Sequence, residues 1–492
     1  MPKSILYFLW IGFTLTALFF YPLAASLSDG LYYMQWNVSN TYELIGCLLL
    51  GMVIVGTLFY YITKMSNKYI SSSLVIVLSI IPLLSFIVHV SRQMGFTSSL
   101  VKFKNMMIVN HNITLIIFLL MLGITLFILI RHKDRVVKFI VSFILIISPV
   151  SVVITTNIIQ HGFKNTLIDI PIEHKKNNSK IKNPPPNIYV ILFDELDYEF
   201  LYKEKEIKPE FPSFLAFSNT STNYHNATSP GDSTLPSMSG LLLGERDKTV
   251  VVCHDRLCEK KSKNKKVPIN FSERNIFKKA KSLGYKTAMY GWMHEYCQQY
   301  AMYLDSCRTY SLYNYSTVNN NISLLNPILT NVQLWPHQFP FGLLKISVYS
   351  KYQQLMVKET LDHVVNVLDY EPPLFMIAHF SLPHIPFVFD AHGFNPPSDP
   401  FLQNRENYIK QLAYTDYVFG EIVDKLKNIG KYENSIIVLT SDHGYRNLLK
   451  QKDWNKVPLL IHHAKNEKSK SDDGAVMTEK VLFMLLNTEN KK

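Results

Sequence analysis

The sequence has few charged residues, few cysteines and no internal repeats. Asp, Glu, Lys and Arg make up 18% of its 492 residues, below the ~25% of an average globular chain. It has 5 cysteines, and their spacings fit no zinc ribbon. The lack of repeats excludes a solenoid or a propeller. A chain of this length is long enough for two or more domains. Its first third is unusually apolar.

Five apolar segments dominate that first third. They lie at residues 5–25, 44–63, 73–90, 113–130 and 139–159. Each is close to the ~20 residues that a helix needs to cross a bilayer. One such run is also typical of a buried core helix, and the first, with Lys3 before it and small residues at 24–26 after it, also fits a cleaved signal peptide. Five runs with short polar gaps favour a bundle of five transmembrane helices over residues 1–160.

Basic residues in the gaps predict the orientation of this bundle. The fourth gap has two Arg and two Lys between positions 131 and 138, and the second has Lys64 and Lys68. Because short basic gaps tend to stay in the cytoplasm, the N-terminus is expected inside and the chain after residue 160 outside. The gap at 91–112 is also basic and would lie outside. We interpret it either as an interfacial segment that attracts anionic lipids or as a solvated loop.

Four of the cysteines form two close pairs in the chain, Cys253 with Cys258 and Cys297 with Cys307. An even number of cysteines in a region placed outside the cytoplasm predicts two local disulfides, whereas in a cytosolic protein the same residues are candidate metal ligands. Residues 161–186 are polar, basic and proline-rich, which predicts a tether.

Residues 187–492 alternate between strand and helix patterns. The expected strands cover 188–193, 286–290, 374–379, 435–440 and 457–461, with helices at 275–283, 355–368 and 412–429. This alternation predicts an α/β sandwich with a mostly parallel sheet. The stretch 259–266 is interpreted as a solvated basic loop. The net charge of +12 is spread over tether, loops and tail, which favours a membrane surface as partner and not a nucleic acid.

Polar side chains follow two of the expected strands. Asp194 ends the first strand, and Asp442 and His443 follow the fourth. Open α/β sheets place their chemistry at this edge. Carboxylate and imidazole ligands suit zinc or manganese better than calcium, so we expect one divalent ion of that kind. The simpler alternatives are a helix cap at Asp194 and an Asx turn with a structural histidine. Glu195 is either a further ligand or solvated.

A cluster of small polar residues around Thr234 precedes an apolar stretch. A hydroxyl at a helix N-terminus lies beside free N–H groups that favour phosphate, and a metal ion makes such a hydroxyl nucleophilic. Ser233 and Ser237 compete for this role, and Thr234 or Ser233 also fits a plain helix cap. His384, in a proline-bracketed loop, is expected to orient a substrate oxygen or protonate a leaving group. His379, within a strand, is interpreted as a core residue.

In this order, these motifs resemble the sulfatase branch of the alkaline phosphatase superfamily, over about residues 185–465. The matching pieces are the strand that ends in Asp194, the Thr-Leu-Pro-Ser-Met run from Thr234, the Pro-His loop at His384, and Ser-Asp-His-Gly at 441–444. With apolar segments ahead of such a domain, the chain looks most like the membrane-anchored transferases that move phosphoethanolamine or phosphoglycerol from a phospholipid to a lipid or glycan.

The resemblance implies roles for single residues. Metal ligands are implied at Asp194, Asp442 and His443, the metal-bound nucleophile at Thr234, and substrate binding at His384 and Ser233. Sulfatases oxidise a Cys or Ser at the nucleophile position to formylglycine, and an arginine follows that residue in their motif. Threonine and Met238 stand at these positions here, which favours a phospho-threonine over sulfate-ester hydrolysis. The transferases usually have glutamate in place of Asp194 and further histidines. We therefore expect Lys450, Lys452 or Lys456 to supply the missing positive charge, with Lys450 as the substrate-binding candidate.

The expected protein is a multi-pass enzyme of the bacterial inner membrane, with its catalytic domain at residues 187–492 on the periplasmic side. Its partners are a phospholipid donor and a lipid or glycan acceptor of the cell envelope. Two alternatives stay open. One is a hydrolase of the same family, a phosphodiesterase or an atypical sulfatase, in which water replaces the acceptor. The other is a non-catalytic membrane scaffold that kept the fold.

Overall fold

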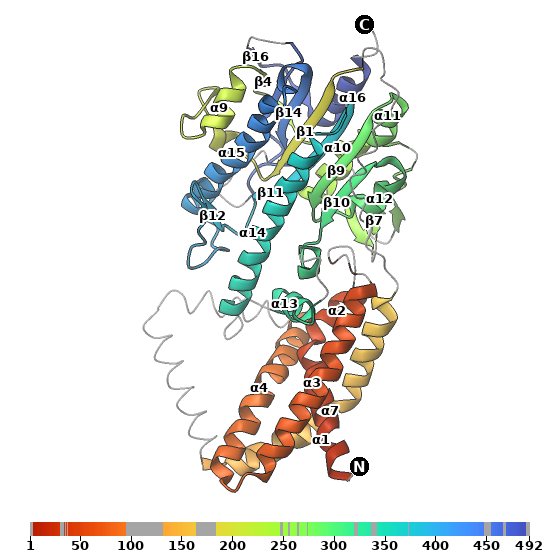
Figure 1. The fold of residues 1–492 in the computed structure, drawn as a ribbon, viewed down its shortest axis with the longest axis vertical. Coiled ribbons are helices and arrows are strands. Elements are labelled where there is room, and N and C mark those ends of the chain that lie inside the picture. The colour runs from red at the N-terminus through yellow and green to blue at the C-terminus, as the bar shows by residue number, and fades with distance from the viewer. Residues whose placement is uncertain are drawn as a thin grey trace. The chain divides into compact units, whose positions relative to one another are not determined.

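The computed structural model forms two compact units (Figure 1). It describes residues 3–29, 34, 36, 38–94, 131–163, 184–246, 249–253, 256–262, 265–272, 274–318, 323–335, 342–371, 373–446, 454–465 and 469–488. The helical unit consists of Met1–Leu31, Trp36–Thr166 and Asn319–Lys345. The α/β unit consists of Tyr32–Gln35, Leu167–Val318 and Ile346–Lys492. Each unit is taken by itself below.

Apolar helices make up the helical unit. They are α1 (Lys3–Phe19), α2 (Tyr21–Asp29), α3 (Val38–Lys64), α4 (Lys68–Gln93), α7 (Lys133–Gly162) and α13 (Leu325–Gln333). Within the described residues, 3 helices (α3, α4 and α7) are long and apolar enough to span a membrane, or up to 4 if the pair α1–α2, bent by 57°, is one span. The structure thus supports three or four spans and not clearly five. The expected segment 113–130 lies outside the described residues.

Helices α1 and α3 approach each other closely at two glycines. A Cβ on Gly12 would lie 2.4 Å from the carbonyl oxygen of Met52, and one on Gly56 would lie 2.7 Å from that of Phe8. Small residues at a helix interface allow this approach, and packing of this kind drives helix association in lipid, where no hydrophobic force holds helices together. The two glycines therefore fix how α1 lies on α3.

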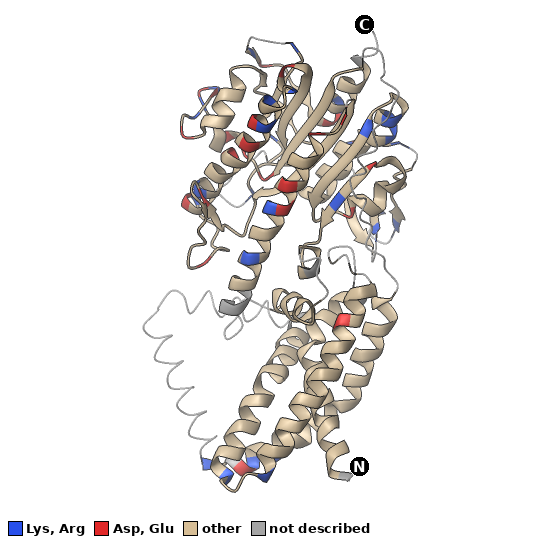
Figure 2. Cartoon of the chain, in the orientation of Figure 1, with Lys and Arg blue, Asp and Glu red and all other residues tan. Residues whose placement is uncertain are grey.

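Basic residues gather at one end of the helical unit (Figure 2). The hydroxyl of Ser72, near the start of α4, donates to Asp134 near the start of α7 over 3.4 Å. This contact brings Lys68 and Lys133, the first residues of α4 and α7, to the same end. Lys64, the last residue of α3, lies four residues before Lys68 in the chain. The clustering agrees with the charge pattern from which we predict the cytoplasmic side.

Helix α13 was not expected from the sequence. It follows β10 of the α/β unit in the chain but belongs to the helical unit. Asn331 accepts a hydrogen bond from the N–H of Leu23 (3.2 Å) and donates to the carbonyl of Phe19 (2.9 Å). Leu325 and Ile328 instead are 55% and 36% exposed. The helix thus buries a polar face and exposes an apolar one, the reverse of a helix on the surface of a soluble protein. Asn331 satisfies backbone groups at the break between α1 and α2, which lipid cannot do.

An 8-stranded mixed sheet forms the centre of the α/β unit, in the order β10-β9-β11-β1-β14-β15-β4-β16. The strands are β1 (Asn187–Asp194), β4 (Thr222–Tyr224), β9 (Lys286–Trp292), β10 (Ser306–Tyr310), β11 (Leu374–Pro383), β14 (Ser435–Ser441), β15 (Leu459–His462) and β16 (Lys470–Asp472). The pairings from β10 to β14 are parallel, as expected, and β15 runs antiparallel to both neighbours. The five expected strands correspond to β1, β9, β11, β14 and β15.

Helices cover both faces of this sheet (Figure 1). The larger ones are α9 (Pro212–Ser218), α10 (Thr234–Leu243), α11 (Ile276–Ser282), α14 (Gly342–Val367), α15 (Arg405–Asn428) and α16 (Thr478–Thr488). The side chains of strand β1 point alternately to the two faces. Ile188, Val190 and Leu192 pack with α10, α11 and α16, while Ile191 and Phe193 pack with α9, α14 and α15. A strand covered on both faces reads as a continuous apolar run, which is why the sequence predicts it well.

Short elements complete the unit. They are α8 (Tyr198–Leu201), β2 (Tyr202–Lys203), β3 (Glu206–Ile207), β5 (Ala227–Thr228), β6 (Val250–Cys253), β7 (Arg256–Ser262), β8 (Lys265–Pro268), α12 (Tyr296–Tyr300), β12 (Phe389–Asp390), β13 (Gly393–Phe394) and β17 (Val476–Met477). Both expected disulfides are present: Cys253–Cys258 joins β6 to β7, and Cys297–Cys307 joins α12 to β10. The expected basic loop is instead the strand pair β7–β8.

The contacts of α13 generate a first prediction. Asn331→Leu should lower the free energy of unfolding of the helical unit by about 1–3 kcal/mol, because it leaves the backbone groups of Phe19 and Leu23 without a partner. The measurement is an unfolding titration of the detergent-purified protein. Leu325→Ala, at an exposed position of the same helix, should change stability by less than about 0.5 kcal/mol. Equal effects of the two substitutions would contradict this role of Asn331.

Candidate metal centre

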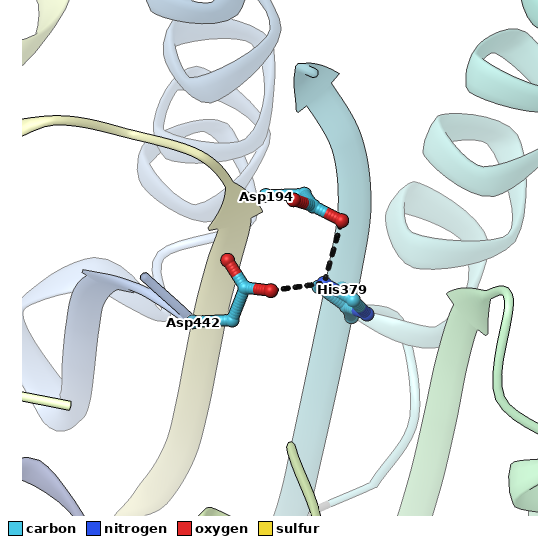
Figure 3. A group of neighbouring side chains, drawn as sticks. All are labelled: Asp194, His379 and Asp442. Atoms are coloured by element: carbon cyan, nitrogen blue, oxygen red, sulfur yellow. Dashed lines mark ion pairs between the residues drawn. The ribbon is translucent and has the colours of Figure 1, made fainter. Parts of the chain in front are cut away.

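Three neighbouring strands bring two carboxylates and an imidazole together (Figure 3). Asp194 is the last residue of β1, Asp442 follows β14, and His379 lies on β11 beside Leu192 of β1. Their ligand atoms all lie within 4.8 Å of one another. His379 Nε2 is 3.9 Å from Asp194 Oδ2 and 3.9 Å from Asp442 Oδ2. Our interpretation of His379 as a core residue was therefore incomplete, because it is buried but faces the two carboxylates.

Two neighbours orient the ring of His379. The hydroxyl of Tyr296 lies 2.9 Å from His379 Nδ1. A Cβ on Gly291 would lie 2.9 Å from the Tyr296 ring and 3.2 Å from the His379 Cβ. Only glycine at position 291 leaves room for this pair. A hydrogen bond at Nδ1 holds the ring and leaves Nε2 to face the carboxylates, as in metal-binding histidines.

His443 and Thr234 lie at the same centre. His443 Nε2 is 3.4 Å from Asp442 Oδ2 and 3.3 Å from the Thr234 hydroxyl. That hydroxyl also donates to Asp194 Oδ2 over 3.3 Å. His443 Nδ1 lies 2.9 Å from the carbonyl of Gly444, which accepts its N–H. The tautomer fixed in this way leaves a lone pair on Nε2, directed at the centre. The structure thus brings together all four residues predicted as metal ligands.

The turn after β14 directs both Asp442 and His443 toward one point. The N–H of His443 and that of Glu195 donate to Asp442 Oδ1 over 2.8 and 3.2 Å. Gly444 is needed in this turn because of its surroundings. It is absent from the glycines with positive φ, but a Cβ on it would lie 2.9 Å from Asp197 Oδ2. Glu195 instead has the positive φ, 65°. Such strain in a non-glycine residue is typical of functional sites.

The charges and burial at this centre fit a divalent cation. Asp194, Asp442, His379 and His443 are all 0% exposed. Among the residues that the structure describes, Asp194 Oδ1, Asp442 Oδ2 and His379 Nε2 have no hydrogen-bond partner. Buried polar atoms are normally paired, and two adjacent buried carboxylates repel each other. A cation between them satisfies all three atoms and both charges. The mixed oxygen and nitrogen ligands match zinc or manganese.

The pKa shifts have the same origin. Burial, followed by repulsion from Asp442, raises the pKa of Asp194 well above its ordinary value. The pKa of Asp442 is lowered overall. Burial alone would raise it, but the nearby His443 and His379 together have the larger, opposite effect. Burial lowers the pKa of His379 to about 4. This imidazole is therefore neutral at pH 7, which is the form that binds a metal.

Thr234 also faces a cavity of about 720 Å³. The cavity is lined by Pro230, Gly231, Asp232, Ser233, Thr234, Leu235, Pro236, Thr249, Val250, Met293, Arg446 and Asn455. Thr234 is the first residue of α10, so the free N–H groups of that helix lie beside its hydroxyl. Ser233 lines the cavity and donates to Asp232 over 3.2 Å. Ser237 is fully buried and donates to the carbonyl of Gly231 (2.8 Å), so it does not compete as nucleophile.

The positive charge at this cavity is Arg446. Its Nε lies 3.3 Å from Glu195 Oε1, and its side chain is 34% exposed. The sequence reasoning missed it, although it lies close to His443 in the chain. Lys450 and Lys452 are outside the described residues. Lys456 pairs with Glu199 over 3.2 Å and is not among the cavity-lining residues, so its expected role stays a prediction.

Two further histidines lie near the centre. His384 Nδ1 is 2.6 Å from the carbonyl of Ile385, and its ring centroid is 5.3 Å from that of Trp292. It is not among the residues that line the cavity, so its role in substrate binding stays a prediction. His294 Nε2 lies 3.2 Å from the carbonyl of Thr234, and burial lowers its pKa to about 3. It thus holds the backbone at the start of α10.

Comparisons with known proteins identify the family of the chain. Residues 186–482 match the model of the family Sulfatase, so the chain belongs to the sulfatase family and the family expected from the motifs is confirmed. A curated relative is the low-salt glycan biosynthesis sulfotransferase Agl7 of Haloferax volcanii. It is 28% identical over 127 residues, which is 24% of this chain and 30% of the relative. The chain therefore matches less than a third of that relative's length.

Solved structures resemble the chain over part of its length. Ps i-CgsB is 18% identical and covers 62% of this chain and 74% of its own, with a TM-score of 0.43. The phosphonate monoester hydrolase of Agrobacterium radiobacter is 14% identical and covers 62% of this chain and 74% of its own, with a TM-score of 0.42.

The unpaired ligand atoms predict the metal content. The purified protein should contain about one zinc or manganese ion per chain, and His379→Ala or Asp442→Ala should lower this to near zero, because each removes a ligand. Elemental analysis of protein that keeps its circular dichroism spectrum is the measurement. His462→Gln removes another fully buried imidazole, on β15, and should leave the metal content unchanged. Full occupancy in His379→Ala would show that His379 is not a ligand.

The buried histidines predict how stability depends on pH. Unfolding returns His379 and His294 from a pKa of about 4 and about 3 to the ordinary 6.5. Between these values the unfolded chain binds more protons, so stability rises with pH. These two histidines should therefore lower the melting temperature of metal-free protein as the pH drops from about 6.5 toward 4. Asp194 acts in the opposite direction, because its raised pKa lets the folded chain bind the extra proton. The test is therefore a comparison of two profiles, in which the melting temperature of His294→Gln should fall less than that of the wild type over this range. Identical slopes would contradict the burial of a neutral ring at His294.

Proposed function

We propose that the protein is a metal-dependent transferase that moves a phosphoethanolamine- or phosphoglycerol-type headgroup from a phospholipid to a lipid or glycan acceptor. The observation that carries this proposal is the position of the Thr234 hydroxyl, 3.3 Å from both Asp194 Oδ2 and His443 Nε2. It lies at the start of α10 and faces the cavity. Threonine has a methyl group on Cβ, so it cannot form the aldehyde used by sulfatases. It is suited to direct attack on phosphorus.

The reaction has two steps. Thr234 Oγ1 attacks the phosphorus, the bond between phosphorus and the diacylglycerol oxygen breaks, and diacylglycerol leaves with the proton of the hydroxyl. An acceptor hydroxyl then attacks the phospho-threonine and restores Thr234. Asp194 Oδ2 accepts the hydrogen bond that orients Oγ1. Arg446 and the N–H groups of α10 lie where the anionic phosphate oxygens have to bind. A divalent ion at this centre lowers the pKa of the coordinated hydroxyl and neutralises phosphate charge.

The membrane topology belongs to the same proposal. The apolar helices anchor the chain, and the basic end of the helical unit is assigned to the cytoplasm. The two disulfides suit an oxidising compartment, so the α/β unit is assigned to the periplasmic side of a bacterial inner membrane. A phospholipid donor reaches such a site by diffusion in the outer leaflet. Agl7, by its name a sulfotransferase of glycan biosynthesis, supports group transfer to a glycan as a reaction of similar proteins.

Hydrolysis is the second candidate function, because a hydrolase is among the similar solved structures. Water replaces the acceptor in that case, and the residues of the first step are the same. Labelled phospholipid, incubated with and without an acceptor glycan, separates the two reactions. Release of free headgroup at a rate that does not depend on the acceptor supports hydrolysis. The complete and buried ligand set argues against the non-catalytic scaffold.

The covalent step predicts a modified residue. Donor lipid without acceptor should add one headgroup phosphate to the wild-type protein, detected as a mass increase that maps to Thr234. Thr234→Ala should show no increase and should lower the transfer rate by about 10⁴-fold or more. Ser233→Ala, next to it in the same cavity, should keep the modification. An unchanged mass in an active wild-type preparation would contradict the phospho-threonine.

A further inference from the structure

A strongly basic strand pair lies beside the cavity of Thr234. The exposed basic residues of β7 and β8 are Arg256, Lys260, Lys261, Lys265 and Lys266. The described acidic residue of this pair is Glu259, which forms an ion pair with Lys261. Within the described part of the chain, neither Lys260 nor Lys266 has an ion-pair partner. The strand pair therefore carries a concentrated positive charge.

The strand register adds repulsion to this charge. Lys260 pairs directly with Lys266 across β7 and β8, whereas Glu259 lies opposite Val267. Like charges directly opposite each other destabilise an antiparallel pair. If the register of the two strands were shifted by one residue, Glu259 would lie opposite a lysine. The arrangement thus weakens the fold locally, and a bound anion removes that repulsion.

The basic strand pair is fixed to the wall of the cavity. Leu257 of β7 and Val250 of β6 pack against Leu235, which follows Thr234 in the chain. Val250 and Thr249 line the cavity itself. The N–H of Lys260 donates to the carbonyl of Thr249 over 2.8 Å. Lys260 is thus one backbone hydrogen bond from the cavity wall, and the disulfide Cys253–Cys258 ties β7 to β6.

We propose that Lys260 and Lys266 bind the acidic groups of an anionic glycan acceptor, phosphate or carboxylate, while one of its hydroxyls enters the cavity of Thr234. The proposal rests on the transferase function above and adds the chemical class of the acceptor. Two ammonium groups side by side match a multiply charged saccharide better than a neutral one. The charge also promotes capture of such an acceptor from solution. Our earlier interpretation of this stretch as a solvated loop gave it no role.

Binding is tested apart from turnover, with the full chain carrying Thr234→Ala in nanodiscs of zwitterionic lipid. Dextran sulfate serves as the anionic saccharide probe and neutral dextran as its control. Dextran sulfate should bind, more weakly as salt is added, and Lys260→Gln/Lys266→Gln should weaken it about tenfold at low salt. Neutral dextran should not bind. The matched variant Lys358→Gln/Lys427→Gln removes the same charge from exposed positions on α14 and α15 and should bind as before. Equal losses in both variants, or none, overturn the proposal.

A bilayer is the competing source of anionic groups, and lysine labelling separates the two. With zwitterionic nanodiscs, dextran sulfate should protect Lys260 and Lys266 from an amine-reactive reagent, as read by mass spectrometry. Nanodiscs rich in phosphatidylglycerol, without the probe, should leave both lysines reactive. Protection by that lipid alone assigns the strand pair to the membrane surface and overturns the proposal. Because no step of this test needs the Thr234 hydroxyl, its failure and a failure of the covalent test are distinguishable.

Discussion

The α/β unit depends on one electrostatic constraint: Asp194 and Asp442 are buried side by side where water cannot separate their charges. Such a pair is stable only if a proton or a cation lies between them. The imidazole of His379, which is neutral at pH 7, cannot neutralise two carboxylates. The sheet edge is therefore a candidate site for a divalent ion, and an ion bound there would contribute to the stability of this part of the fold.

The same constraint explains why a hydroxyl lies at this edge. The carboxyl ends of β1 and β14 supply the acidic ligands, and the start of α10 supplies Thr234 together with unpaired N–H groups. Positive potential thus reaches Thr234 from the helix N-terminus and from Arg446, and an ion held by the acidic ligands would add to it. A tetrahedral anion that enters the cavity would meet these groups. Glu195, whose φ is positive, holds Arg446 through an ion pair in which Arg446 Nε lies 3.3 Å from Glu195 Oε1.

Much of the fold and most of the site were predictable from the sequence because their signals are local. Strand ends and a helix start predict Asp194, Asp442, His443 and Thr234 without knowledge of the sheet. His379 was not predictable in this way, because its role depends on β11 pairing with β1, and nothing near it in the chain encodes that pairing. Helix α13 was missed because its buried face is polar, the opposite of the apolar pattern that indicates a packed helix.

The position of α13 in the chain has a consequence for how the protein is divided into parts. Its residues come after β10 and before α14, yet its asparagines satisfy groups on the apolar helices. A fragment that begins at the tether (residues 161–186) would contain α13 but not the apolar helices that it contacts. Both the amide and the apolar side chains of α13 would then lie in water. Each unit consists of three segments of the chain, so the polypeptide passes between the two units five times. The α/β unit is therefore not a module that can be cut free at one peptide bond.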